Sequence, residues 1–396
     1  MIDPDRPEDS PGFGTIPMNK KAFAVLVASM FISMLGMGIV SPFLPIYANT
    51  LGASSLQVGM VQAAFSVTGI GTLLFVGRLS DRFGRKSFLS AGLSILAVSS
   101  LGLMSAKNPV QLILWRFIQG LGASAHMPIA QAYLGDITPV GNEGKWMGYF
   151  NAVLFAGMGA GPLVGGVITD AFNMKTTFLV MAALNVLALI ATLIFLREMP
   201  RKIGAREHAS FGAPLKSGTM RGVLSYCTAN AIGASSLMAF IPLFADLKIG
   251  LSTSLIGIML AARTPVSLLQ SYTGRLADRL NRRYMVIWGG IGAITAVALL
   301  PLTGGFWTLL AAYISVSIGQ AFGMPAANAY VVHEGRTYGM GTSMTMYMLA
   351  MHVGQSIGPV VLGSVADWFG IKSVFYAAAG CMAAGVMLFS LKVRDR

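Results

Sequence analysis

Long apolar stretches separated by short polar segments dominate the chain. Twelve of them reach roughly 20 residues, the length that a helix needs to cross about 30 Å of hydrocarbon. None has the polar face that a helix of a soluble protein turns toward water. The pattern therefore predicts an all-α membrane protein with twelve transmembrane helices. Their centres lie near residues 33, 67, 96, 122, 157, 186, 234, 263, 294, 318, 353 and 382.

The second half of the chain repeats the first at an offset of 197 residues. The matching segments are Gly77–Arg82 with Gly274–Arg279, Met127-Pro128 with Met324-Pro325, Gly161-Pro162 with Gly358-Pro359, and Asp170 with Asp367. A repeat this long indicates a duplicated domain, and parallel repeats in a membrane protein favour two halves that move around a site between them. We expect two pseudo-symmetric six-helix bundles. The predicted boundaries are a flexible tail (1–19), a first bundle (20–197), a cytoplasmic linker (198–220) and a second bundle (221–396).

The net charge of +13 would suit a nucleic-acid-binding protein, but the distribution of Lys and Arg excludes that class. With the N-terminus inside, 22 of the 28 basic residues fall in the termini and the even-numbered loops. This asymmetry is typical of the positive-inside rule. It predicts a multi-pass protein of the cell inner (plasma) membrane with both termini cytoplasmic. Anionic lipid headgroups are the expected partners of the basic loops, and we expect a monomer.

A charged loop links the second and third predicted spans. Gly77 and Gly84 permit a tight turn and a close helix approach. Asp81 can meet the positive end of a helix dipole or a neighbouring arginine. The other charged residues of the loop are Arg78, Arg82, Arg85 and Lys86. Composition alone favours a positive inside loop as much as a functional one.

With this loop, the sequence resembles the major facilitator superfamily over nearly its whole length from about residue 20. The loop signature of that family, Gly-x-x-x-Asp-Arg-x-Gly-Arg-Lys/Arg, is matched in full, whereas the second copy has Asn281 at the later glycine. The resemblance implies a loop that latches the two halves together on the cytoplasmic side. It further implies that Asp81, with Arg78 and Asp136, stabilises the outward-open state. It says nothing of the substrate.

Two further motifs resemble the proton-coupled drug exporters of that superfamily. The fifth span carries a glycine and proline motif that could also be a packing seam of any transporter. Its residues are Gly157, Gly161, Pro162, Gly165 and Gly166, and its second copy has Leu362 in place of one glycine. The fourth span carries Arg116-x-x-Gln119-Gly120-x-Gly122, which is similar to the exporters' motif around a buried arginine.

Arg116 and Arg263 are the two basic residues inside predicted spans. An arginine there costs about 2.5–3.5 kcal/mol on insertion scales, so it normally faces a cavity or a partner. For Arg116, snorkelling to the outer headgroups is the alternative. Arg263 lies near the middle of its span, and we interpret it as a binding or gating charge, with a structural partner to backbone carbonyls as the alternative.

Other polar residues at membrane depth are weaker candidates for substrate binding or proton coupling. His126 and His352 could titrate, although a lone histidine in a span is more often a satisfied hydrogen-bonding residue. Neutral side chains that could bind substrate, or join helices, are Gln119, Gln320, Asn328 and Gln355. No His/Asp/Glu group has the spacing of metal ligands, so we expect no metal and no cofactor, with a proton gradient as the energy source.

All 15 acidic residues fall in tails, loops or span ends, and none lies at mid-membrane. Exporters of cationic drugs commonly carry an acid in a central span. A cavity with Arg116 and Arg263 and no acid would favour anionic or neutral amphipathic substrates.

We expect a secondary active transporter that exports small amphipathic compounds in exchange for protons. The alternative is a transporter or uniporter of an organic anion or lipid-like amphiphile, with Arg263 contacting its headgroup. An enzyme would need a nucleophile–base pair or a metal cluster in the spans, and the sequence has no acid at membrane depth to serve as the base. A channel is disfavoured because no loop resembles a selectivity filter.

Overall fold

The computed structural model describes residues 20–72, 75–138, 142–198, 213–277 and 280–393. The predicted N-terminal tail and most of the predicted linker lie outside these ranges. Within them the chain forms helices and no strand. The helices of the first half are α1 (Lys20–Val40), α2 (Leu44–Thr50), α3 (Ser55–Thr72), α4 (Val76–Phe83), α5 (Arg85–Ser105), α6 (Pro109–Ile137), α7 (Glu143–Ala171) and α8 (Met174–Phe195).

The second half follows the same order. Its helices are α9 (Gly218–Phe244), α10 (Thr253–Ala261), α11 (Arg263–Ala277), α12 (Arg282–Leu299), α13 (Phe306–Tyr338), α14 (Met340–Phe369) and α15 (Ile371–Lys392). Among the described residues, nine helical segments are long and apolar enough to cross a membrane. Helices α3, α6 and the α10–α11 pair occupy the other three predicted spans. The predicted all-α fold is therefore confirmed.

Polar residues set several helix starts. The Asn108 side chain accepts a hydrogen bond from the backbone NH of Gln111, and Pro109 is the first residue of α6. Asn173 does the same for α8 by accepting from the NH of Thr176. Such caps satisfy backbone donors that have no partner within the helix, and a proline at the first position has no donor to satisfy.

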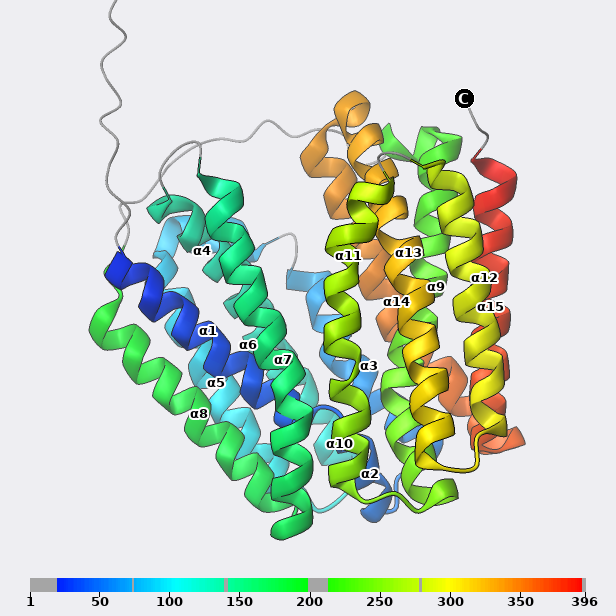
Figure 1. Ribbon diagram of the computed structural model, residues 1–396. Coiled ribbons are helices and arrows are strands. Elements are labelled where there is room, and N and C mark those ends of the chain that lie inside the picture. The colour runs from blue at the N-terminus through cyan, green and yellow to red at the C-terminus, as the bar shows by residue number, and fades with distance from the viewer. Residues whose placement is uncertain (1–19, 73–74, 139–141, 199–212, 278–279, 394–396) are drawn as a thin grey trace, which may run out of the picture.

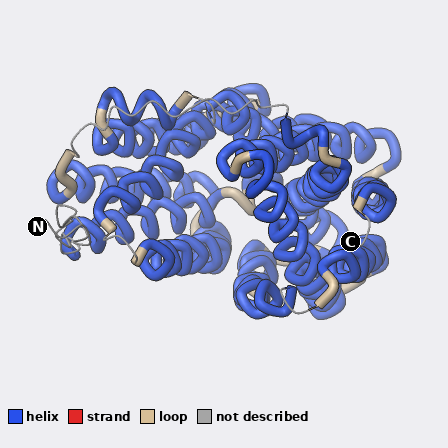
Figure 2. Tube along the Cα trace, turned by 90° about the horizontal axis from the view of Figure 1, so that it is seen from above, coloured by secondary structure: helices blue, strands red, loops and turns tan. Residues whose placement is uncertain are grey.

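The helices pack as two bundles (Figures 1 and 2). In the first half, α1 packs on α7 and α8, and α5 packs on α6 and α8; in the second half, α9 packs on α14 and α15, and α12 packs on α13. The halves meet mainly where α3 packs on α14 and where α7 packs on α10. We call the face at which α1 starts and α15 ends the terminal face, and the opposite one the distal face.

The apolar core is shared at one face and divided at the other. The largest buried cluster lies toward the distal face and joins Phe43 and Phe178 of the first half to Phe240 and Phe244 of the second. Toward the terminal face the described residues form two separate clusters. One lies in the first half around Tyr133, and the other lies in the second half around α9, α12 and α13. Among the described residues, the halves therefore share a buried apolar core toward the distal face and not toward the terminal face.

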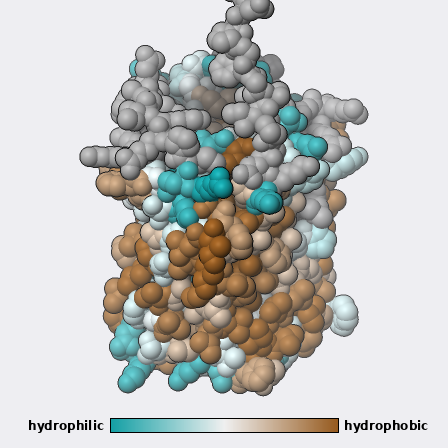
Figure 3. All heavy atoms as spheres, turned by 90° about the vertical axis from the view of Figure 1, so that its left-hand side faces the viewer, coloured by the Kyte–Doolittle hydropathy of each residue, from teal (hydrophilic) through white to brown (hydrophobic). Residues whose placement is uncertain are grey.

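On the side formed by the first half, the outer surface is apolar over most of its height (Figure 3). Large exposed apolar side chains follow the outer side of α8, for example Leu187, Ile190 and Ile194. Hydrophilic residues border this region at the distal edge. An apolar surface of this extent suits contact with lipid tails.

Candidate functional site

The halves meet at two contacts, which we call the α3–α14 seam and the α7–α10 seam. Both depend on glycines, which have no side chain to keep the helices apart. Gly59 of α3 lies directly against the carbonyl of Pro359 in α14, and Gly257 of α10 lies against the carbonyl of Pro162 in α7. A Cβ atom at either glycine would collide with that carbonyl. Close backbone approach of this kind is how small residues let membrane helices pack.

The motif of the fifth span has two working faces. Gly157, Gly161 and Gly165 lie against the backbone of α1 in the same half. Pro162 and Gly166 instead lie against α10 of the other half. The four-residue spacing of the first three glycines places them on one side of α7, and the other two residues follow one position later. The motif therefore fixes α7 within its bundle and also supplies the seam.

The second copy of the motif keeps the face toward the other half. Pro359 and Gly363 lie against α3, as Pro162 and Gly166 do against α10. The departure from the motif, Leu362, is on the other face and is buried in the shared core. The replaced glycine therefore alters packing within the second bundle and leaves the seam intact.

Toward the middle of the molecule, each seam ends where a polar side chain of the second half lies over a glycine of the first. The ring of His352 on α14 lies directly over Gly69 of α3, and a Cβ at Gly69 would lie 2.6 Å from the His352 Cε1 atom. Among the described residues, the buried Nδ1 of His352 has no hydrogen-bond partner. At the other seam, the side chain of Thr264 on α11 lies over Gly159 of α7.

Arg263 is the residue before this contact, at the start of α11. The eighth span is interrupted at this point, since α10 ends at Ala261 and α11 begins at Arg263. The guanidinium of Arg263 donates a hydrogen bond to Oε1 of Gln320 on α13, at 2.9 Å, and its side chain is half-buried. The structure thus brings two predicted site residues together beside the seam.

Arg116 lies inside the first half, between α6 and α3. Its guanidinium donates hydrogen bonds to Gln119 (2.6 Å) and to Gln62 (3.3 Å), and it stacks on the Phe65 ring at 4.6 Å. The residue is 1% exposed, so the side chain does not reach the outer surface. The sequence analysis missed Gln62 and Phe65. Both lie in a span that aligns with α6 only once the bundle is folded.

The remaining candidates are dispersed. His126 is buried on α6, where its Cβ and Cα atoms lie over Gly92 of α5 in the first half. Asn328 lies beside the Tyr347 hydroxyl in the second half. Gln355 is half-buried on α14. The structure therefore does not group these residues with Arg263, and only Gln355 shares a helix with His352.

The loop motif is described in part. Gly77, Arg78, Asp81 and Arg82 belong to α4, but the surroundings of Gly77 and the side chains of the three charged residues lie outside what the structure describes. Arg85 forms an ion pair with Asp136, which joins α5 to α6 within one half. Glu198 accepts hydrogen bonds from the backbone NH groups of Lys86 (3.0 Å) and Ser87 (3.3 Å) and so caps the start of α5.

Gly84 provides the space for this cap. Its φ is +102°, and a Cβ there would lie 2.7 Å from the Glu198 carboxyl carbon. In the second half Asn281 occupies the equivalent position and caps α12 with its own side chain, which accepts from the NH groups of Arg283 and Tyr284. The glycine-to-asparagine change in the second copy therefore replaces a cap from the segment after α8 with a local one.

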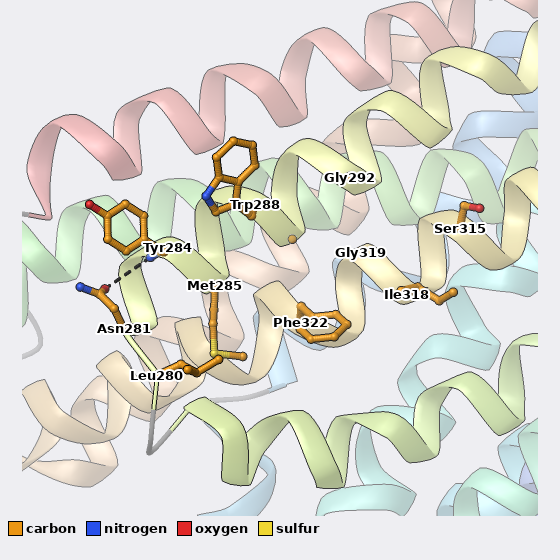
Figure 4. A pocket seen from close by; sticks show the side chains of 11 residues that line it. Leu280, Asn281, Tyr284, Met285, Trp288, Gly292, Ser315, Ile318, Gly319 and Phe322 are labelled. Carbon is orange, nitrogen blue, oxygen red and sulfur yellow. Dashed lines mark hydrogen bonds between the residues drawn. The ribbon is translucent and has the colours of Figure 1, made fainter.

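A groove of about 670 Å³ opens on the flank of the second half (Figure 4). Its lining comes from α12, α13 and the segment before α12, and includes Tyr284, Trp288 and Phe322. Trp288 is 67% exposed on the apolar outer surface. The groove faces the surroundings of the helix bundle, away from the seams, and contains none of the predicted site residues.

Comparison with known proteins agrees with this architecture. The family profile of the Major Facilitator Superfamily matches residues 26–263 and 223–396. The quinolone resistance protein NorA of Staphylococcus aureus is 26% identical over 388 residues, which are 96% of this chain and 98% of the relative. Multidrug resistance protein 1 of Bacillus subtilis is 28% identical over 385 residues, which are 94% of this chain and 96% of the relative. The resemblance inferred from the motifs is confirmed.

Solved structures of the same fold include transporters of different substrates. The nucleoside transporter NupG has a TM-score of 0.82 at 15% identity, over 96% of this chain and 100% of that chain. The human organic anion transporter MFSD10 has a TM-score of 0.63 at 16% identity, over 93% of this chain and 99% of that chain. At these identities the likeness concerns the fold alone.

Proposed function

Because this chain belongs to the major facilitator superfamily of transporters, which are not enzymes and need no cofactor, we propose that it moves its substrate by alternating access. The observation that carries this proposal is the division of the core. The halves share one apolar cluster toward the distal face and have separate clusters toward the terminal face. Rocking of two such bundles around the seams would expose a central site to each side in turn.

We infer that the terminal face is cytoplasmic and that the protein lies in the plasma membrane. The excess of Lys and Arg in the termini and even-numbered loops supports this orientation. The structure then corresponds to an inward-facing state. The ion pair of Arg85 with Asp136 fits it, because both partners belong to the first half and so do not close the cytoplasmic side. A single chain contains both halves, which supports action as a monomer.

The substrates that we propose are small amphipathic compounds, exported in exchange for protons. The relatives named for quinolone and multidrug resistance support export, and so does the motif of the fifth span. For coupling we favour His352, because it lies in contact with the opposite half and its Nδ1 atom has no partner among the described residues. His126 is the weaker candidate, since it is buried within one bundle.

A second candidate substrate class is an organic anion or a lipid-like amphiphile with an anionic headgroup. The position of Arg263 favours it. Its half-buried guanidinium lies beside the α7–α10 seam and is held by a neutral glutamine. The acids of the described helices lie close to helix ends, for example Asp136, Asp170 and Asp367. Such a charge distribution attracts an anion more than a cation.

A flux screen in proteoliposomes tests both candidates. Cationic and anionic amphiphiles are offered with and without an imposed pH gradient, and the matched control is the same lipid without protein. Gradient-stimulated export of cationic or neutral compounds supports the first candidate. Saturable, counterflow-capable flux of anions that ignores the gradient supports the second and contradicts proton antiport.

A further inference from the structure

An aspartate of the first half caps a helix of the second half at the distal face. Asp170, next to the last residue of α7, accepts hydrogen bonds from the backbone NH groups of Thr253 (3.0 Å) and Ser254 (2.7 Å). These are the first two residues of α10. The Thr253 hydroxyl also donates to Asp170 and lies 3.1 Å from the carbonyl of Gly166.

The mirror contact joins the second half to the first. Asp367, two residues before the end of α14, accepts hydrogen bonds from the NH groups of Ser55 (2.7 Å) and Leu56 (3.0 Å). These are the first two residues of α3. Each carboxylate uses one oxygen for each amide, so the two caps have the same geometry.

The third amide of each helix is satisfied locally. The side chain of Ser54, the residue before α3, accepts a hydrogen bond from the backbone NH of Gln57. The side chain of Ser252, the residue before α10, accepts one from the NH of Leu255 in the same way. The first two amides of α3 and α10 therefore depend on an acid of the opposite half. A carboxylate at this position also meets the positive end of the helix dipole.

We propose that Asp170 and Asp367 form a symmetric distal gate. The two caps hold the halves together at the distal face in the state that the structure shows, and both must break when that face opens. In the open state both carboxylate caps are lost at once. The backbone NH groups of Ser55, Leu56, Thr253 and Ser254 then hydrogen-bond to water instead. The inference rests on alternating access, which is part of the proposed function, but on neither the substrate nor the coupling ion.

The gate predicts graded effects. Loss of a capping side chain changes such an equilibrium by about fivefold. Asp170→Ala and Asp367→Ala should each raise the ratio of distal-open to distal-closed protein by that factor. If the caps act independently, the double variant should raise it by about 25-fold. Asp170→Asn and Asp367→Asn keep one acceptor oxygen and should have smaller effects of the same sign.

Distance measurement by pulsed electron spin resonance reads this ratio in the full chain without substrate. Spin labels are attached at Lys107→Cys in the first half and Leu302→Cys in the second, both exposed near the distal face, in a Cys227→Ser, Cys381→Ser background. Nanodiscs provide the membrane. The matched control is Asp246→Ala, an acid near the same face whose side chain forms no hydrogen bond to the other half among the described residues.

A shift of the distance distribution toward longer distances in the double variant, with smaller shifts in the single variants and none in the control, supports the gate. An unchanged distribution in the double variant overturns it. The asparagine variants serve where an alanine variant fails to fold, and the same two outcomes apply to them. If the distances shift as expected but the protein shows no proton-coupled flux, the gate is supported and the proposed proton coupling is contradicted.

Discussion

The α3–α14 seam and the α7–α10 seam start identically at the distal face and differ at mid-depth. At the distal end of each, an aspartate caps the opposite half and a glycine lies against the first residues of the capped helix. One turn further on, a proline carbonyl meets a glycine. Toward the middle, one seam ends in His352 over Gly69, and the other ends in Thr264 over Gly159 beside Arg263.

This difference separates two tasks. A gate that closes between two halves needs matching contacts on both sides, so duplication preserves it. A substrate has no such symmetry, and a polar group that binds it needs to be present only once. We therefore assign the distal parts of the seams to closure and their mid-depth ends to binding and coupling. The predictions below test this division.

The broadest effect, a loss of transport for every substrate, should come from filling the seam itself. A Cβ at Gly166 or Gly363 would lie 2.5 Å from the carbonyl oxygen of Thr253 or Ser55, and both contacts join the halves. Gly166→Val and Gly363→Val should each disfavour the distal-closed state by about 1–3 kcal/mol, the usual cost of overpacking. Transport in proteoliposomes should fall roughly tenfold or more.

Gly148→Val in the same helix α7 is the matched control, because a Cβ there meets no atom within 4 Å. It introduces the same β-branched residue away from the seam and should retain transport close to that of the parent protein. If only one of the two seam variants lost activity, the equivalence of the seams at the distal face would be wrong.

Removing the charge at one seam should change substrate choice. Arg263→Ala loses a charge-assisted hydrogen bond to Gln320, a kind of interaction worth about 1.5–3 kcal/mol. Uptake of an anionic amphiphile by Arg263→Ala should fall roughly 10- to 100-fold, and uptake by Arg263→Lys should lie between that of the parent protein and that of Arg263→Ala. Uptake of a neutral amphiphile should change less. Initial rates for an anionic and a neutral substrate measure this.

The contrast is Arg116→Ala. This arginine is buried within the first half, so its loss should lower the melting temperature of that bundle rather than alter selectivity. Equal rates for the anion before and after Arg263→Ala would remove Arg263 from the binding site and leave the mid-depth difference between the seams without a function.

The fold was predictable because most spans are long and apolar, and because the repeat extends over both halves of the chain. The working faces of the fifth-span motif were not predictable, since residue spacing defines a stripe on α7 but not which helix meets it. The contacts also reveal that Gly59 corresponds to Gly257, at an offset of 198 rather than 197. The second copy is one residue shorter between this point and the loop motif, and the eighth span is interrupted there at Ala262.

The helices that Asp170 and Asp367 contact across the seams could not be predicted from the sequence either. The repeat pairs the two acids with each other, but each bonds to a helix start far away in the sequence. Of the candidate site, the sequence identified Arg263 and Gln320 as polar residues at depth. Their contact depends on how α11 packs on α13.

A smaller effect is expected at the α3–α14 seam. His352→Gln keeps a polar side chain of similar size over Gly69 but cannot take up a proton near neutral pH. Gradient-driven export should fall about tenfold, whereas substrate counterflow at equal pH should stay within about twofold. His126→Gln is the matched control, because that ring is buried between α5 and α6. Loss of gradient response in the control alone would move coupling away from the seam.

The smallest effect tests whether the halves remain equivalent away from the seams. Glu198, in the segment after α8, caps α5, whereas Asn281 caps α12 from the residue just before that helix. The two halves therefore cap the equivalent helix with different residues. Glu198→Ala and Asn281→Ala should each lower stability by about 1 kcal/mol, because each removes a capping acceptor at a helix start. Thermal unfolding in detergent measures both, and transport should be retained. A much larger loss of stability for Glu198→Ala would mean that this carboxylate also holds the end of α8 against α5. Asn281 caps its own helix and joins no second helix in this way.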